Sequence, residues 1–130
     1  MVYLDSSAIV KLVVPEPESE ALRRFLADHE DRVASGLVRV EVLRALRRTH
    51  GRSRAAPRRA EQVLEGIALV AVDEAILHDA AALGPAPLRS LDAVHLATAL
   101  SLDGLEALVT YDLRLRAAAV AAGLEVESPA

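Results

Sequence analysis

The stretch VYLDSSAIVKLVV, residues 2–14, decides the fold class because it joins a buried strand to a helix through an acidic corner. The apolar run Val2–Leu4 predicts a short buried strand. Residues 6–14 predict the helix that follows, and Asp5 stands between the two. A buried strand that passes directly into a helix is typical of α/β proteins, in which helices connect parallel strands.

The rest of the sequence continues this alternation of strands and helices. Further strands are predicted at residues 32–35, 67–72, 107–110 and 124–126. Further helices are predicted at 18–29, 36–49, 74–83, 90–102 and 113–122, and one more runs to residue 65 after a polar break at 51–57. Pro85 and Pro87 predict an exposed loop at 84–88. The pattern predicts one domain over residues 1–130, an α/β fold with a mostly parallel central sheet in a three-layer α/β/α sandwich.

The composition excludes several classes of protein. Just over half of the 130 residues are apolar but three are aromatic, so Leu, Val and Ala must build the core. Few aromatic residues argue against stacking of bases on aromatic side chains. The absence of cysteine excludes disulfides, zinc–thiolate sites and thiol nucleophiles. No apolar run approaches the roughly 18 residues of a membrane span, and Asp5 and Lys11 interrupt the region where a signal peptide would be apolar. We therefore expect a cytoplasmic protein with no membrane contact.

Charge is distributed unevenly along the chain, whose formal net charge is −4. Residues 39–59 hold eight arginines and one acid, whereas residues 60–130 hold three arginines and eleven acids. Such a basic stretch could contact phosphate or an acidic partner. It is equally typical of two solvated helices whose arginine stems cover apolar neighbours. The sequence leaves both interpretations open.

Four acidic residues stand out because they are embedded among Leu, Val and Ala rather than among polar neighbours. They are Asp5 in VYLDSS, Glu41 in RVEVLRAL, Asp92 in LRSLDAVHLATAL and Asp112 in LVTYDLRL. Asp5 and Asp112 follow predicted strands, at the edge of the sheet where α/β proteins bind ligands. Carboxylates gathered from distant segments repel one another unless a cation neutralises them, and oxygen ligands suit Mg²⁺ or Mn²⁺. The pattern indicates a metal-dependent nuclease.

Three of these acids also have simpler structural explanations. Asp5 and Asp112 could each cap the helix that follows by accepting hydrogen bonds from backbone N–H groups. Glu41 could form an ion pair with Arg44, three residues later on the same helix. The pattern of all four acids together, rather than any one of them, favours a functional site.

Asp92 is harder to explain by local structure alone. Ser90 is the better predicted cap, and the helix that follows is apolar nearly all round, so a carboxylate there requires a partner. His95 lies one turn after Asp92. We interpret it as a helix-packing histidine with one hydrogen bond and leave it outside the catalytic set.

Four segments together resemble the PIN-domain family, and specifically the VapC-type ribonuclease toxins of bacterial toxin–antitoxin pairs. They are YLDSSAIVKL, SGLVRVEVLRAL, LRSLDAVHLATAL and LVTYDLRLRAAAVAAGLEV, and the resemblance covers the whole chain. It implies that Asp5, Glu41, Asp92 and Asp112 are the catalytic residues of an endoribonuclease that hydrolyses RNA with Mg²⁺ or Mn²⁺. Asp5, Asp92 and Asp112 would bind the metal directly, and Glu41 would act through water or orient the nucleophile.

The resemblance includes two hydroxyl groups, but the chain differs from some relatives in the residues that follow Asp112. Ser6 and Thr110 match hydroxyl positions that support the first and last aspartates. In place of the further acid that some relatives carry after the last aspartate, this chain has Leu113, Arg114 and Leu115. A second metal would therefore bind weakly or with substrate.

The resemblance also implies partners. A small antitoxin would occlude the site, and one of its arginines could meet the carboxylates in place of metal. A homodimer is expected from the Leu- and Val-rich, aromatic-poor surface. The alternative function is a catalytically silent PIN-like protein-binding module, in which we would expect the acidic quartet to be broken, and here it is intact.

Overall fold

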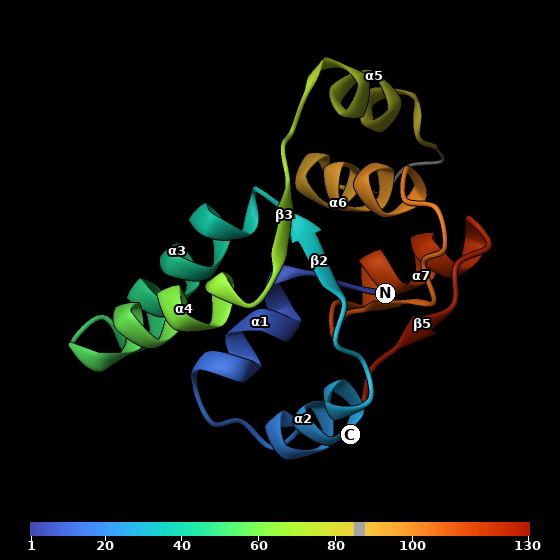
Figure 1. Ribbon diagram of the computed structural model, residues 1–130. Coiled ribbons are helices and arrows are strands. Elements are labelled where there is room, and N and C mark those ends of the chain that lie inside the picture. The colour runs from blue at the N-terminus through green and yellow to red at the C-terminus, as the bar shows by residue number, and fades with distance from the viewer. Residues whose placement is uncertain (85–87) are drawn as a thin grey trace.

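A parallel β-sheet forms the centre of the protein (Figure 1). The computed structural model describes residues 1–84 and 88–130, and in this part of the chain five strands lie in the order β3-β2-β1-β4-β5. Every neighbouring pair is parallel. The strands are β1 (Val2–Leu4), β2 (Arg32–Ser35), β3 (Ala68–Val70), β4 (Ala107–Val109) and β5 (Val126–Glu127). The central position of β1 agrees with its uninterrupted apolar sequence.

Helices cover both faces of this sheet (Figure 1). One layer holds α1 (Ser6–Val13), α2 (Ser19–Ala27), α3 (Val38–His50) and α4 (Ala55–Glu65), and the other holds α5 (Glu74–Ala82), α6 (Ser90–Leu100) and α7 (Leu113–Ala121). In the first layer α1 contacts α2, α3 and α4, and in the second α6 contacts α5 and α7. The predicted three-layer α/β/α sandwich with a mostly parallel sheet is confirmed. Within the described ranges, no helix is long and apolar enough to cross a membrane.

The central strand β1 contributes to the core on both sides, because successive side chains point to opposite faces of a sheet. Val2 and Leu4 pack in the core beneath α1, whereas Tyr3 packs on the other face with Leu96 of α6 and Leu108 of β4. The buried apolar side chains are mostly Val, Leu and Ala. The core therefore has the composition expected from the sequence.

Strand register places the first and last acidic segments next to each other. Leu4 pairs with Val109, and the Asp5 backbone N–H donates to the Val109 carbonyl at 3.3 Å. The residues that follow these two strands, Asp5 and Thr110, consequently lie side by side at the carboxyl-terminal edge of the sheet. This is the edge at which open α/β sheets bind ligands.

The helix α4 begins earlier than the sequence predicts. It starts at Ala55, inside the predicted polar break at 51–57. The Ser53 hydroxyl accepts a hydrogen bond from the Ala56 backbone N–H at 3.1 Å, which satisfies one of the free donors of the first turn. Pro57 also fits this first turn, where its missing N–H costs nothing.

The start of α6 differs in another way. Ser90 is its first helical residue rather than its cap, and the N-cap is Arg89, whose side chain makes no capping hydrogen bond. The predicted strands at 67–72 and 124–126 are shorter or shifted, as β3 and β5 show. Of the loop predicted at 84–88, residues 85–87 lie outside the described residues.

Candidate active site

The four carboxylates singled out in the sequence line one cavity of about 340 Å³ at this edge of the sheet. Asp5 follows β1, Glu41 lies in the first turn of α3, Asp92 lies in the first turn of α6, and Asp112 precedes α7. The structure thus brings together acids that are up to 107 residues apart in the sequence. Arg89 and His95 line the same cavity.

Asp5 is the most buried of the four, with 3% of its surface exposed. Its Oδ1 accepts hydrogen bonds from the Ala8 backbone N–H at 3.0 Å and from the Ser7 hydroxyl at 2.6 Å. Its Oδ2 accepts one from the Thr110 hydroxyl at 2.5 Å. Burial raises the pKa of Asp5 above its ordinary value, and these hydrogen bonds oppose that rise. Asp5 therefore caps α1 and faces the cavity at the same time.

The Thr110 hydroxyl connects the first and last aspartates. It donates to Asp5 and accepts a hydrogen bond from the Asp112 backbone N–H at 3.0 Å. Asp112 in turn caps α7, because its Oδ1 accepts from the backbone N–H groups of Arg114 and Leu115 at 2.8 and 3.1 Å. The capping explanation of both aspartates is correct and compatible with a position on the cavity.

The hydroxyl that supports Asp5 from its own helix is that of Ser7, and the expectation for Ser6 was wrong. Ser7 also accepts a hydrogen bond from the Tyr111 backbone N–H at 2.9 Å, so it holds the end of β4 against the start of α1. Ser6 lines the cavity beside them. Two adjacent serines cannot be ranked from the sequence, because the choice depends on which side of the first helical turn faces β4.

Arg89 lies between two of the carboxylates, a contact that the sequence interpretation missed. Its Nε donates to Asp92 Oδ2 and its Nη2 donates to Asp112 Oδ2, both at 3.0 Å. The spacing of three residues between Arg89 and Asp92 is a local signal that could have suggested the first contact. The second contact joins residues 23 positions apart, and nothing in the local sequence predicts it.

The raised pKa of Asp5 comes from burial rather than from neighbouring acids. Asp92 and Asp112 instead share the positive charge of Arg89. The side chain of Arg89 is 58% exposed, so this charge can move away from the cavity without a change in the fold.

Glu41 is held by His95, and its expected ion pair with Arg44 does not occur among the described residues. Glu41 Oε1 lies 2.6 Å from His95 Nε2, and His95 Nδ1 lies 2.6 Å from the Tyr3 hydroxyl. His95 is buried in α6 as expected, but it has two hydrogen-bond partners rather than one. Each ring nitrogen contacts a residue of a different element, Nδ1 that of β1 and Nε2 that of α3.

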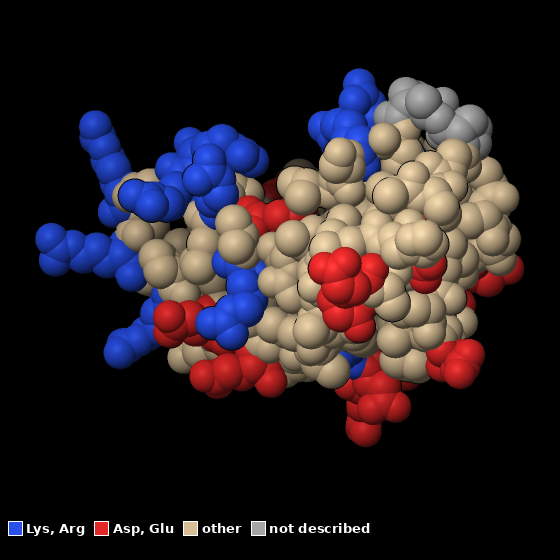
Figure 2. Space-filling view, turned by 90° about the horizontal axis from the view of Figure 1, so that it is seen from above, with Lys and Arg blue, Asp and Glu red and all other residues tan. Residues whose placement is uncertain are grey.

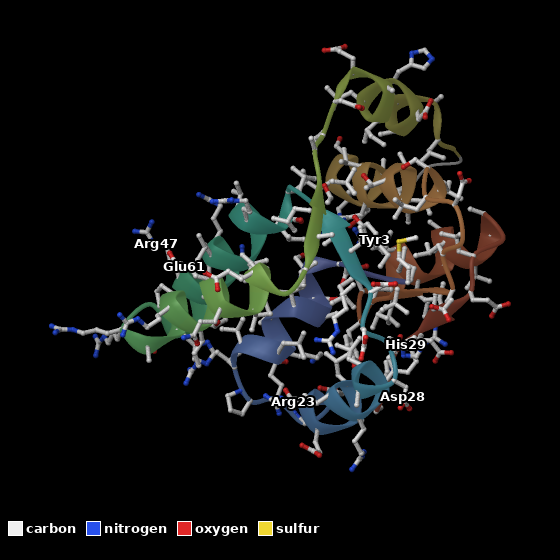
Figure 3. The ribbon with its side chains drawn as sticks, viewed as in Figure 1. Tyr3, Arg23, Asp28, His29, Arg47 and Glu61 are labelled. Carbon is white, nitrogen blue, oxygen red and sulfur yellow. The ribbon has the colours of Figure 1, made fainter. Side chains whose placement is uncertain are left out.

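Of the two neutral tautomers of His95, the one with its proton on Nε2 satisfies this chain of hydrogen bonds. The Tyr3 oxygen accepts a hydrogen bond from the Ser35 backbone N–H at 3.1 Å, so its own proton is available to donate to Nδ1. The proton on Nε2 then donates to Glu41. Burial raises the pKa of Tyr3, which keeps its hydroxyl protonated. Figure 3 shows Tyr3 in the interior below α6. The chain of hydrogen bonds from Tyr3 through His95 to Glu41 therefore runs from the core to the cavity.

The family model for the PIN domain matches residues 2–121. The chain belongs to the PIN-domain family. This PIN domain is 51% identical to Ribonuclease VapC46 of Mycobacterium tuberculosis over 129 residues, which cover 98% of this chain and 97% of that relative. It is 40% identical over 134 residues to Ribonuclease VapC47 of the same species, with 99% and 97% covered. The resemblance to VapC-type PIN domains is confirmed.

A solved structure supports the same fold. A chain of a toxin–antitoxin complex from Klebsiella pneumoniae matches this PIN domain with a TM-score of 0.74 and 21% sequence identity. The match covers 100% of this chain and 98% of that chain. At this level of identity the match concerns the fold, which is the three-layer PIN fold described above.

The donor atoms of this PIN domain fit a hard divalent cation, because the cavity gathers four carboxylates and no sulfur ligand. Among residues 1–84 and 88–130, however, no three acidic or histidine side chains are close enough together to hold an ion as they stand. The position of Arg89 offers a physical reason, since its guanidinium fills the space between Asp92 and Asp112. A cation would replace one positive charge with another at the same carboxylates.

Proposed function

We propose that this PIN domain is a metal-dependent endoribonuclease and the toxin of a toxin–antitoxin pair. The observation that carries the proposal is the convergence of Asp5, Glu41, Asp92 and Asp112 from four separate elements on one cavity. The ribonuclease names of the two M. tuberculosis relatives support RNA as the substrate. The intact set of acids argues against the alternative, a catalytically silent protein-binding module.

The carboxylates have different roles in this proposal. Asp5, Asp92 and Asp112 would hold Mg²⁺ or Mn²⁺. A bound ion of this kind neutralises charge on the phosphodiester and lowers the pKa of a coordinated water. Asp5 is fixed in place by Ser7, Ala8 and Thr110, so its position does not depend on the cation.

Glu41 would orient the attacking water and accept its proton. The Nε2–H of His95 donates to one oxygen of Glu41, which leaves the other oxygen available toward the cavity. Because Tyr3 fixes the tautomer of His95, the carboxylate of Glu41 has a defined direction. General-base catalysis requires such a group within hydrogen-bond reach of the water.

Arg89 would leave Asp92 and Asp112 when the cation binds. Its guanidinium, released from these two carboxylates, is then available to bind two oxygens of a substrate phosphate through two parallel hydrogen bonds. This exchange keeps the charge of the cavity balanced in both states.

The partner in this proposal is an antitoxin. The solved Klebsiella pneumoniae relative is described as a toxin–antitoxin complex, which supports a partner of this kind for this chain. Arg89 illustrates how an antitoxin arginine could bind here, since a guanidinium already bridges two of the carboxylates at 3.0 Å. We also propose a homodimer, for which the exposed apolar side chains of α7 are candidates.

RNA cleavage tests the proposed function directly. Purified protein should cleave a mixture of cellular RNA in Mg²⁺ or Mn²⁺ and not in EDTA. Asp5→Asn and Asp92→Asn should each abolish cleavage, because a carboxamide has nearly the same shape but does not neutralise a cation. Wild-type cleavage by both variants would show that the acids are not the catalytic centre.

A further inference from the structure

The α3–α4 hairpin carries a concentration of positive charge that the proposed chemistry does not use. Residues 39–59 hold eight arginines and one acid, a formal charge of +7, so the other 109 residues carry −11. The arginines are Arg39, Arg44, Arg47, Arg48, Arg52, Arg54, Arg58 and Arg59. Figure 2 shows blue side chains gathered at the end of the molecule formed by α3 and α4.

All eight arginines are exposed, and within the described residues none of them forms a salt bridge. The two helices are held by apolar contacts instead, through buried side chains such as Val42, Leu46, Ala56 and Ala60. Packing therefore uses the inner face of the hairpin, and the charges remain on the outside. Like charges at this density repel one another unless a polyanion binds.

The hairpin begins at the candidate active site. Glu41, in the first turn of α3, lines the cavity. From Glu41, the nine further residues of α3 extend about 14 Å at 1.5 Å per residue. Arg47 and Arg48 follow Arg44 by three and four residues, which places each of them roughly 5–6 Å from Arg44 on the same side of the helix. A polyanion bound at the cavity would lie within reach of these side chains.

Recognition of bases by stacking is not available to this chain. Tyr3 is fully buried, and Phe25 is stacked on His29. Tyr111 is partly buried and donates its hydroxyl proton to the Pro129 carbonyl. With its three aromatic side chains engaged in the fold, the protein must bind nucleic acid mainly through the phosphate backbone. Arginine suits this task because its planar guanidinium binds phosphate through two hydrogen bonds.

We propose that the α3–α4 hairpin is a docking arm for the RNA backbone that flanks the cleaved bond. It would bind phosphates without regard to base sequence and would hold the RNA so that one phosphodiester reaches the carboxylates. The proposal rests on the proposed ribonuclease function, because that function brings RNA to the adjacent cavity. Outside residues 39–59 the chain carries a net negative charge, which would confine RNA to the part of the hairpin that bears the arginines.

The salt dependence of RNA binding tests the arm. In an Asp5→Asn background, which prevents cleavage, fluorescence anisotropy measures the Kd of a labelled RNA hairpin between 50 and 200 mM salt. Replacing Arg44, Arg47 and Arg48 with Gln should reduce the slope of log Kd against log salt by about 2–3, and weaken binding roughly 100-fold near 0.1 M salt. The matched control is Gln at Arg23 and Arg24 of α2, and Figure 3 shows Arg23 far from Arg47. The control should change the slope by less than one.

An unchanged salt slope in the triple variant would overturn the proposal. An equal loss of RNA affinity in the Arg23 and Arg24 control would overturn it as well. A labelled poly-glutamate peptide distinguishes an acidic protein partner, because loss of peptide binding with unchanged RNA binding would also overturn it. If wild-type protein binds RNA through these arginines but does not cleave it with Mn²⁺, the proposed docking arm is supported and the proposed ribonuclease function is refuted. If the wild-type protein cleaves RNA and the triple variant binds RNA as tightly as the control, the ribonuclease function is supported and the docking arm is refuted.

Discussion

At the scale of single residues, Arg89 determines the charge balance of the cavity. Its guanidinium binds Asp92 and Asp112 while most of its side chain is exposed to solvent. Because the arginine side of these ion pairs is exposed to solvent, Arg89 can be displaced at small cost. A cation that binds the same carboxylates must compete with it.

We predict that Arg89→Gln increases the affinity for Mn²⁺. The variant removes the competing charge, so the rise in melting temperature on adding Mn²⁺ should be larger than in wild type. Differential scanning fluorimetry measures this rise. Arg114→Gln on α7 is the control and should behave as wild type, since the backbone rather than the side chain of Arg114 contacts Asp112. A smaller Mn²⁺ shift in Arg89→Gln would contradict the proposed exchange.

The buried relay from Tyr3 to Glu41 gives a second prediction at this scale. Tyr3→Phe leaves both the Ser35 N–H and His95 Nδ1 without a partner in the core, which should cost about 1–3 kcal/mol of unfolding free energy. Urea unfolding measures the loss. Tyr111→Phe should cost less, because its hydroxyl is partly exposed and bonds one carbonyl. Cleavage should fall in Tyr3→Phe beyond the loss of folded protein, since Glu41 loses its fixed orientation.

At the scale of the elements, Asp5 is both the N-cap of α1 and a buried carboxylate. Burial raises its pKa above the value of about 3.9 expected in the unfolded chain. A group with a raised pKa in the folded state gives its full contribution to stability below the unfolded pKa and loses it as pH rises through the raised value. At neutral pH without metal, the charged form of Asp5 therefore opposes folding.

Asp5→Asn should consequently melt no lower than wild type at pH 7 in EDTA, and its advantage should shrink as the pH falls to about 4. Thermal melts at both pH values measure the difference. Asp73→Asn is the matched control, because Asp73 caps α5 through the Ile76 N–H but does not line the cavity. Since Asn caps nearly as well as Asp, the control should change little at either pH. A lower melting temperature for Asp5→Asn at pH 7 would mean that the hydrogen bonds that the Asp5 carboxylate accepts from Ser7 and Thr110 outweigh the cost of its burial.

The sequence predicts elements well where the signal is local. The apolar run before Asp5 and the periodic helices after it give α/β alternation, and capping by Asp5 and Asp112 follows from their place after a strand. The wrongly predicted helix boundary also comes from local sequence. Ser53 and Pro57 can begin a helix as readily as they can mark a break, which explains the early start of α4.

At the scale of the whole molecule, exposed apolar side chains on α7 predict that the protein forms a homodimer. Leu113 and Val120 of α7 are 79% and 57% exposed. An apolar groove of about 500 Å³ runs along α7, and its other side is lined by Leu83, Leu88 and Leu96. We predict that the purified chain is a dimer by light scattering and that Leu113→Glu together with Val120→Glu gives monomers with unchanged secondary structure. Val40→Glu on α3 is a control with a similarly exposed apolar side chain. A wild-type monomer at micromolar concentration would contradict the homodimer.

The contacts that the sequence could not predict are those between distant elements. Glu41 and His95 are 54 residues apart, and Arg89 and Asp112 are 23 apart, so each depends on how α3, α6 and α7 pack. Sequence reasoning chose the four acids by their apolar neighbours and by family resemblance. The alternative explanation of Glu41 named Arg44 because it is near in sequence, whereas the residue that contacts Glu41 in the structure is His95.

The most direct test of the account is to locate manganese by anomalous diffraction in crystals of the metal-free protein soaked in Mn²⁺. We predict an anomalous peak in the cavity within coordination distance of Asp5, Asp92 and Asp112, with Arg89 turned away from both of its carboxylates. The same soak of Asp5→Asn should show a weaker peak or none. If wild-type crystals soaked in millimolar Mn²⁺ show no manganese in the cavity, and Arg89 still bridges Asp92 and Asp112, the result would contradict a metal-dependent active site.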